Sequence, residues 1–206
     1  MRIRVAKLKD AAALARVHYA CSPELAESFM ARLGPQFLRQ YYRVLLQEKN
    51  SVVICAENSN QDVVGFISGS LDATEHMPEL KRHRVSLFLG ALPALLRHPS
   101  LLKGMLDRQN SKSADVADDS FVVLTGARWE FWAHLPEARA GGAALKLFKS
   151  WLTMMRGFGT GTIRFEVDED TPKIVRLHRT LGAQVLRKYT TPDGKSRFLM
   201  AYPSSS

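Results

Sequence analysis

The chain is short of cysteine, and the two cysteines that it has, Cys21 and Cys55, stand far apart in the sequence. Neither belongs to a Cys-x-x-Cys pair, so the sequence lacks the pattern of a disulfide framework or of a structural zinc site. Thiols of this kind are typical of a reducing compartment. We therefore expect a cytoplasmic protein that needs no metal.

Long hydrophobic runs are also missing. The longest, residues 85–96, contains Gly90 and Pro93 and is shorter than the roughly 20 residues that a membrane-spanning helix requires. The basic N-terminus leads into an alanine-rich stretch that Asp10 and Arg16 interrupt, so no apolar segment of a signal peptide follows it. These absences favour a soluble protein.

The composition is that of a globular domain. The 206 residues are 46% hydrophobic and 24% charged, which predicts one compact domain over residues 1–206. The formal net charge is +9, which favours polyanionic partners such as a nucleic acid, an anionic membrane or a ligand with several phosphates. Alternatively, the lysines and arginines only solvate the surface.

The N-terminal part of the sequence predicts two helices between strands. Apolar and basic residues alternate at 2–8, which indicates a half-buried strand, and Asp10 is expected to cap the first helix. Pro35 lies near the start of a second helical pattern. Residues 51–57 and 63–71 are then expected to form two strands of a hairpin, joined by a polar turn.

Residues 74–120 separate this hairpin from the C-terminal half. The pattern of residues 74–108 is helical, and Pro93 and Pro99 are expected to divide it into short helices. The polar residues 109–120 favour a mobile loop. Residues 81–108 mix basic and apolar side chains, so contact with a membrane face is a further interpretation of this segment.

The C-terminal half alternates between strands and helices. This alternation predicts a mixed sheet with helices packed on its faces. A Pro-Asp-Gly turn at 192–194 makes the last two strands antiparallel. The expected strands are 121–134, 163–168, 184–189 and 197–202, and the expected helices are 143–156 and 172–181.

Residues 135–145, between an expected strand and an amphipathic helix, have the composition of an anion site. Small residues there let the backbone approach a ligand, and the free N–H groups of the first helical turn attract negative charge. Arg139 adds a cation that can contact phosphate oxygens. We therefore expect a diphosphate at residues 139–144, although Gly141 and Gly142 could also serve only to make a tight turn.

The same segment resembles a known motif. Residues 137–144, Glu-Ala-Arg-Ala-Gly-Gly-Ala-Ala, are similar to the Arg-x-x-Gly-x-Gly/Ala pyrophosphate motif of the GNAT acetyltransferases, with Arg139, Gly142 and Ala144 on the matching positions. About thirty residues later the chain resembles the second signature of that family, Asn-Pro-x-x-x-x-x-Tyr-x-x-x-Gly-Phe. Here Thr171 replaces the Asn, and His178 replaces the Tyr. Ala183 stands in place of the Phe.

The resemblance covers most of the chain outside residues 74–120, and it implies a fold class and a reaction. The fold is expected to be α/β, with a mixed, mostly antiparallel central sheet flanked by helices and a helical insertion, 74–120, between the third and fourth strands. The implied reaction moves an acetyl group from acetyl-CoA to an amine, without a metal. The pantetheine arm is expected to lie between two splayed strands, like an added strand.

The resemblance also implies the residues of the site. Those expected to bind acetyl-CoA are Trp132, Ala133, His134, Arg139, Ala140, Gly141, Gly142, Ala143, Ala144 and Thr171. A general base must accept a proton from the amine, and Glu130 is the first candidate, with Glu166 the second. His178 occupies the position from which relatives protonate the CoA thiolate. Packing of His178 alone is equally consistent with the sequence, in which case Tyr189 or a water donates the proton.

The sequence says least about the acceptor, the molecule that receives the acetyl group. Residues 74–120 are expected to contribute to its binding, and similar proteins suggest a small-molecule amine such as an amino sugar. The alternatives are a catalytically silent CoA-binding module and a nucleic-acid binder; no aromatic and basic strand face or helix-turn-helix pattern supports the latter. The length of the acyl group stays open, as does the oligomeric state, with a homodimer as one option.

Overall fold

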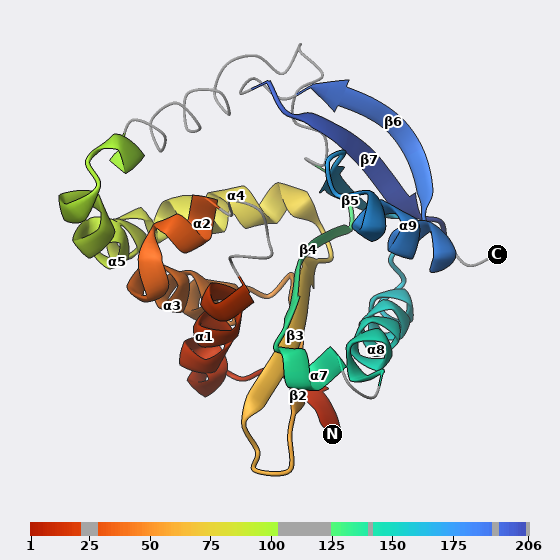
Figure 1. Ribbon diagram of the computed structural model, residues 1–206, viewed down its shortest axis with the longest axis horizontal. Coiled ribbons are helices and arrows are strands. Elements are labelled where there is room, and N and C mark those ends of the chain that lie inside the picture. The colour runs from red at the N-terminus through yellow and green to blue at the C-terminus, as the bar shows by residue number, and fades with distance from the viewer. Residues whose placement is uncertain (22–28, 103–124, 140–141, 191–193, 205–206) are drawn as a thin grey trace.

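The computed structural model describes residues 1–21, 29–102, 125–139, 142–190 and 194–204 (Figure 1). Its strands are β1 (Arg2–Val5), β2 (Ser51–Glu57), β3 (Val63–Ser70), β4 (Arg128–His134), β5 (Ile163–Asp168), β6 (Gln184–Thr190) and β7 (Ser196–Tyr202). They form a seven-stranded sheet in the order β1-β2-β3-β4-β5-β7-β6. Neighbours run antiparallel except β4 and β5, which run parallel. The predicted mixed, mostly antiparallel sheet is therefore confirmed.

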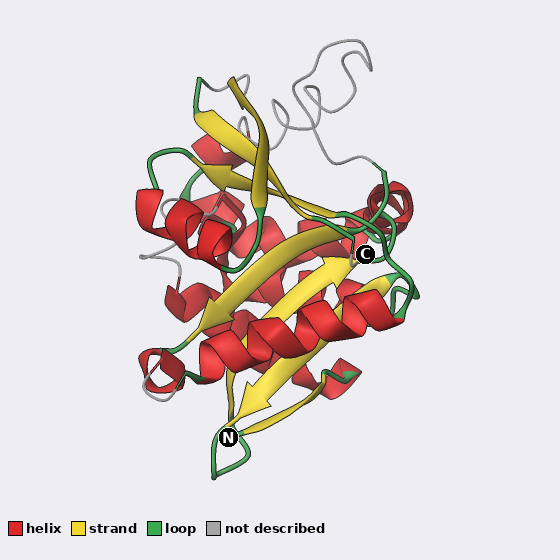
Figure 2. Cartoon of the chain, turned by 90° about the vertical axis from the view of Figure 1, so that its right-hand side faces the viewer, coloured by secondary structure: helices red, strands yellow, loops and turns green. Residues whose placement is uncertain are grey.

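The helices follow the predicted order. They are the short 3-10 helix η1 (Leu8–Asp10), α1 (Ala11–Cys21), α2 (Phe29–Arg32), α3 (Gly34–Leu45), α4 (Ala73–Arg82), α5 (Arg84–Arg97), α7 (Pro136–Arg139), α8 (Ala143–Gly157) and α9 (Pro172–Thr180). Helices α1, α3 and α5 lie on one side of the sheet, and α8 and α9 lie on the other (Figure 1). Figure 2, viewed from the side of α8, shows a helix crossing in front of the strands.

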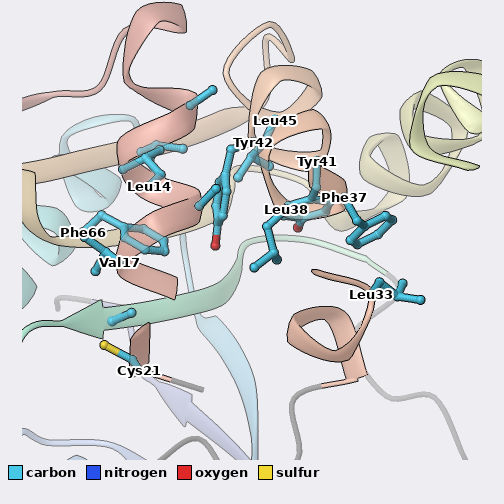
Figure 3. Close-up of a cluster of buried hydrophobic side chains, with 14 of the residues drawn as sticks. Leu14, Val17, Cys21, Leu33, Phe37, Leu38, Tyr41, Tyr42, Leu45 and Phe66 are labelled. Carbon is cyan, nitrogen blue, oxygen red and sulfur yellow. The ribbon is translucent and has the colours of Figure 1, made fainter. Parts of the chain in front are cut away.

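Each face of the sheet has its own apolar core, because side chains alternate along the strands. In β2, Val53 and Cys55 belong to the core under α1 and α3, whereas Val52 and Ile54 belong to the core under α8. Figure 3 shows the first core, in which side chains from α1 and α3 meet Phe66 of β3. Together the two cores hold the sheet between two helical layers.

Three boundaries differ clearly from those expected. The strand expected at 2–8 ends at Val5, because residues Leu8–Asp10 form the 3-10 helix η1. The break expected at Pro93 is wrong, because α5 continues through Pro93 and the two helices instead separate at His83. Proline removes one helical hydrogen bond, but α5 also buries Ala91 and Leu95 in the core shared with α3, which favours its continuation. Pro99 follows the end of α5, as a helix-terminating proline should.

The strand expected at 121–134 also begins later, at Arg128. Residues 121–124 lie outside the described part, as do residues 109–120, for which a loop was predicted. Gly126 has a φ of 72°, a left-handed conformation that a strand does not use. Its N–H donates to Asp72 Oδ1 over 3.0 Å and its carbonyl accepts from the Ala73 N–H over 2.9 Å, so the chain bends here against the start of α4.

Strands β4 and β5 separate almost as soon as they meet. Within these two described strands, one register pair joins them, Arg128 with Arg164. Beyond that pair, β4 stays paired with β3 as far as His134, and β5 stays paired with β7 along its length. The later residues of β4 and β5 therefore diverge and turn one backbone edge of each strand toward the other, which is the splay that the resemblance implies.

Candidate active site

Helix α8 begins at a glycine that no other residue type would replace without strain. Gly142 precedes the helix with a φ of 67°, and no side chain caps it. The first backbone bond of the helix runs from the Lys146 N–H to the Gly142 carbonyl over 3.0 Å. The N–H groups of Ala143, Ala144 and Leu145 are thus not used by the helix and can bind an anion.

Part of the predicted diphosphate site lies outside the described residues. Ala140 and Gly141 are not described, and neither is the side chain of Arg139, whose backbone closes α7. A groove of about 590 Å³ begins at Gly142 and follows the exposed side of α8. Lys146 and Lys149 line it, so positive charge extends from the start of α8 along the helix.

The three β4 residues expected beside the pantetheine arm lie where the strands diverge. Ala133 pairs with Phe66 and His134 with Gly65, so the backbone of β4 is bonded to β3 on one side and faces β5 on the other. The ring of Trp132 lies on the α8 side, 5.2 Å from the ring of Phe148 between centroids. Trp132, Ala133 and His134 therefore share the divergent part of β4.

A bulge in β4 isolates Glu130. Ser68 pairs with Phe131 and Gly69 pairs with Trp129, so Glu130 has no partner residue in β3. Bulges redirect side chains, and this one places Glu130 on the side of α3 and α4. Its side chain is 4% exposed, and neither carboxylate oxygen accepts a hydrogen bond from the described residues. Both oxygens of Glu130 therefore stay available to accept a hydrogen bond or a proton from a ligand.

Aromatic and ionisable groups surround Glu130. His76 of α4 places Nε2 at 3.7 Å from Glu130 Oε1. Burial and the charge of Glu130 raise the pKa of the Tyr41 phenol of α3. The second candidate base, Glu166, is held differently, because its Oε2 lies 3.4 Å from Arg197 Nη1 in an ion pair. Glu166 is therefore engaged by a guanidinium, whereas neither oxygen of Glu130 accepts a hydrogen bond from the described residues.

His178 is completely buried, on the opposite side of the sheet. Its ring packs between Trp129 and Phe165, with centroids at 4.7 Å from both, and its Nδ1 lies 2.6 Å from the Tyr202 hydroxyl. Burial lowers the pKa of His178 to about 4, so the ring is neutral near pH 7. Burial also raises the pKa of Tyr202, so this phenol keeps its proton.

The hydrogen bond between His178 and Tyr202 engages Nδ1 of the ring, and either group can be its donor. Among the described residues, His178 Nε2 has no hydrogen-bond partner, and neither does the indole N–H of Trp129 or Trp132. The core beside the diverging strands thus holds three buried ring nitrogens without a partner among the described residues.

Thr171 lies directly after β5, at the N-terminus of α9. Its hydroxyl donates to the Asp168 carbonyl over 2.6 Å, so its proton is engaged locally. The hydroxyl oxygen can still accept a hydrogen bond from a ligand amide. This position is at the open end of the divergence between β4 and β5.

Sequence reasoning missed Glu48 and His76. Glu48 lies in the turn between α3 and β2, and its Oε2 is 2.9 Å from Nδ1 of His76 in α4. Both side chains are buried. The two residues are 28 positions apart and no motif joins them. A single histidine near the start of the helical pattern expected at 74–108 carried no signal of its own.

In the described parts of the chain, no group of three or more His, Cys, Asp or Glu side chains could hold a metal ion. Among the described helices, none is long and apolar enough to cross a membrane.

Comparisons with known proteins support the fold. No protein-family model matches the sequence, and no curated protein matches it. Solved structures do match, at low identity. One is a Desulfovibrio desulfuricans protein assigned to the GNAT family of acetyltransferases, with a TM-score of 0.59 and 11% identity over 99% of each chain.

Two further structures are similar over nearly the whole chain. The Salmonella typhimurium protein yncA, assigned as an acetyltransferase and solved with acetyl-CoA, has a TM-score of 0.60 and 14% identity over 100% of this chain and 95% of its own. An aminoglycoside 6'-acetyltransferase has a TM-score of 0.59 and 12% identity over 98% of this chain and 97% of its own. These likenesses agree with the diverging parallel strands and with the glycine at the start of α8. We conclude that the chain has the fold of the GNAT acetyltransferases.

Proposed function

We propose that the chain is an acetyl-CoA-dependent N-acetyltransferase that acts, as one domain over residues 1–206, on a primary amine of a small molecule. The observation that carries this proposal is the buried Glu130 carboxylate. It accepts no hydrogen bond from the described residues and lies at a bulge in the strand that diverges from its parallel neighbour. A proton acceptor therefore adjoins the place where the fold can receive an extended ligand.

The residues around the divergence fit acetyl-CoA. The N–H groups at the start of α8, together with residues 139–142, would hold its diphosphate, and Lys146 and Lys149 add positive charge along the same helix. The free edge of β4 at Ala133 and His134 would bond to the amides of the pantetheine arm. Thr171 would accept from the same arm at the end of β5.

The chemistry requires two proton movements. The amine nitrogen forms a bond with the thioester carbon, the carbon–sulfur bond breaks, and the electron pair leaves with the CoA thiolate. Glu130 takes the proton that the amine loses. His178 is neutral and completely buried, so it is a poor acid, and the thiolate takes its proton from water.

The acceptor class rests on the fold and on the enclosure of the base. Glu130 is 4% exposed in its side chain, so an amine that reaches it must enter the protein rather than rest on its surface. A small molecule does this more readily than a folded protein. One structure of the same fold is named for an aminoglycoside, an amine-bearing sugar, which keeps an amino sugar as our first candidate.

The first test is binding. Calorimetry should show that the parent protein binds acetyl-CoA and that Gly142→Glu does not, because this substitution adds strain and negative charge where the diphosphate is expected. Gly157→Glu is the matched control, since it places the same charge in open space at the other end of α8. Equal acetyl-CoA affinity of Gly142→Glu and Gly157→Glu would show that this loop is not the site.

The second test is turnover, measured as thiol release with a panel of amino sugars, aminoglycosides and polyamines. We expect at least one amine to be acetylated, and Glu130→Gln to lower kcat/KM by about a hundredfold or more with the Kd for acetyl-CoA unchanged. Tight binding of acetyl-CoA without turnover of any amine would favour a silent CoA-binding module instead.

A further inference from the structure

Among the buried ionisable side chains that the proposed function does not use, His76 lies beside Glu130 and Glu48 contacts His76. The side chain of Glu48 is 4% exposed and that of His76 is 9% exposed. Burying charged groups is costly unless they are paired. Because His76 contacts both Glu48 and Glu130, we consider an electrostatic role for this pair beside packing.

The hydrogen bonds orient the imidazole of His76. Glu48 Oε2 accepts from Ser51 Oγ over 3.1 Å and lies 2.9 Å from His76 Nδ1. A carboxylate only accepts, so Nδ1 carries a proton and points at Glu48. The opposite nitrogen, Nε2, then faces Glu130 Oε1 at 3.7 Å. His76 thus lies between two buried carboxylates.

The charges around His76 favour its protonated form. Burial opposes a charge on the ring, but the hydrogen bond to Glu48 and the negative charges of Glu130 and Glu48 together raise the pKa of His76. Arg128, at the start of β4, acts in the opposite direction. Tyr41 of α3 packs against the ring at 6.4 Å between centroids and stays protonated, so it adds no charge.

We propose that His76, held by Glu48, is a positioning residue that supplies the positive charge beside the Glu130 carboxylate. This inference rests on the proposed function. Without the imidazolium, the buried Glu130 would have neither a hydrogen bond from the described residues nor a cation facing it from α4, and surroundings of this kind favour the neutral form of a carboxyl group. A protonated carboxyl group cannot accept the proton of an amine.

The catalytic test is the pH dependence of kcat/KM in His76→Gln, which keeps a polar side chain of similar length. We expect the acidic limb of the profile to move upward by about one pH unit or more, while the Kd for acetyl-CoA stays within about twofold of the parent value. Glu48→Gln should move the limb in the same direction. His83→Gln, at the C-terminal end of the same helix, is the control and should leave the profile unchanged.

A second measurement does not depend on activity. NMR titration of the His76 ring should give a lower pKa in Glu130→Gln than in the parent, because one of the two carboxylates has lost its charge. An unchanged titration of His76, or an unmoved acidic limb in a folded His76→Gln, would overturn the inference. If the coupling is present but the parent acetylates no amine, the proposed function fails while the electrostatic pairing stands.

Discussion

His18 and His178 lie in different cores but have the same chemical surroundings. In each, Nδ1 lies 2.6 Å from a buried tyrosine hydroxyl, that of Tyr42 or of Tyr202. Burial lowers the pKa of both rings to about 4, whereas an exposed histidine titrates near 6.5. Between pH 6.5 and pH 4 the two histidines therefore bind protons in the unfolded chain but not in the folded one. The free energy of unfolding consequently decreases as the pH falls through this range.

This difference predicts acid sensitivity. The stabilising effect of keeping His178 neutral is complete above pH 6.5 and is lost progressively toward pH 4, by up to about 3 kcal/mol. His178→Phe should therefore lose less stability than the parent when urea unfolding at pH 7 is compared with unfolding at pH 4.5. His98→Phe replaces an exposed histidine and should keep the acid sensitivity of the parent. Identical losses in all three proteins would contradict the assignment.

At the scale of single residues, some features of the candidate site follow from the sequence and others do not. Gly142 was predictable, because a left-handed residue before an uncapped helix needs glycine and the motif spacing marks the position. The environment of Glu130 was not, since its burial depends on a bulge whose position follows from pairing with β3. The contact of Glu48 with His76 required the tertiary fold to bring the two segments together.

Helix α5 shows how one element can be half core and half surface. Leu95 is 7% exposed and packs with α3, whereas its neighbour Leu96 is 74% exposed. Val85 and Leu89 are also exposed, at 66% and 60%, so this apolar face contributes little to the folding of the described part of the chain. The sequence predicted the helix from its apolar residues but could not say which of them the core would use.

Substitutions on α5 should separate these two sides. Leu95→Ala should lower the free energy of unfolding by about 2–5 kcal/mol, because it empties a packed position. Leu96→Ala, the adjacent and nearly identical change, should lower it by less than about 0.5 kcal/mol. Urea unfolding of the two variants tests this, and a large loss in Leu96→Ala would show that another part of the chain covers that side chain.

Two of the strands were predicted at both ends, whereas β1 and β4 were not. Residues 51–57 and 163–168 match β2 and β5 at both ends, because each is a continuous or alternating apolar run bounded by turn residues. Helix ends in residues 74–102 were less predictable, since tertiary packing of Ala91 and Leu95 favoured a helix that Pro93 alone would have broken. Local rules were thus reliable where no tertiary contact opposed them.

For the whole molecule, the net charge of +9 and the basic groove along α8 bear on the same ligand. Positive charge on the protein attracts a phosphorylated ligand, and dissolved salt screens this attraction. The screening length is about 10 Å at an ionic strength of 0.1 M. The charge therefore contributes to affinity and association rate rather than to the choice of acceptor.

Binding of acetyl-CoA should accordingly weaken as potassium chloride is raised, with a steeper dependence than that of its 3'-dephospho form. Lys146→Gln combined with Lys149→Gln should flatten this dependence, because both lysines line the groove that begins at Gly142. Lys9→Gln combined with Lys49→Gln removes the same charge from exposed positions elsewhere and should preserve it. Calorimetry over a series of salt concentrations would measure the slopes, and equal slopes in both double variants would argue against the groove.

The divergence of β4 and β5 leaves this sheet with two backbone edges in its middle, bridged on one face by the core under α8. An extended co-substrate bonded to those edges would join the two halves as an additional strand does. By mass action, a ligand at a hundred times its Kd adds about 2.7 kcal/mol to the stability of the protein that binds it. The protein would then resist proteases better with acetyl-CoA bound than without it.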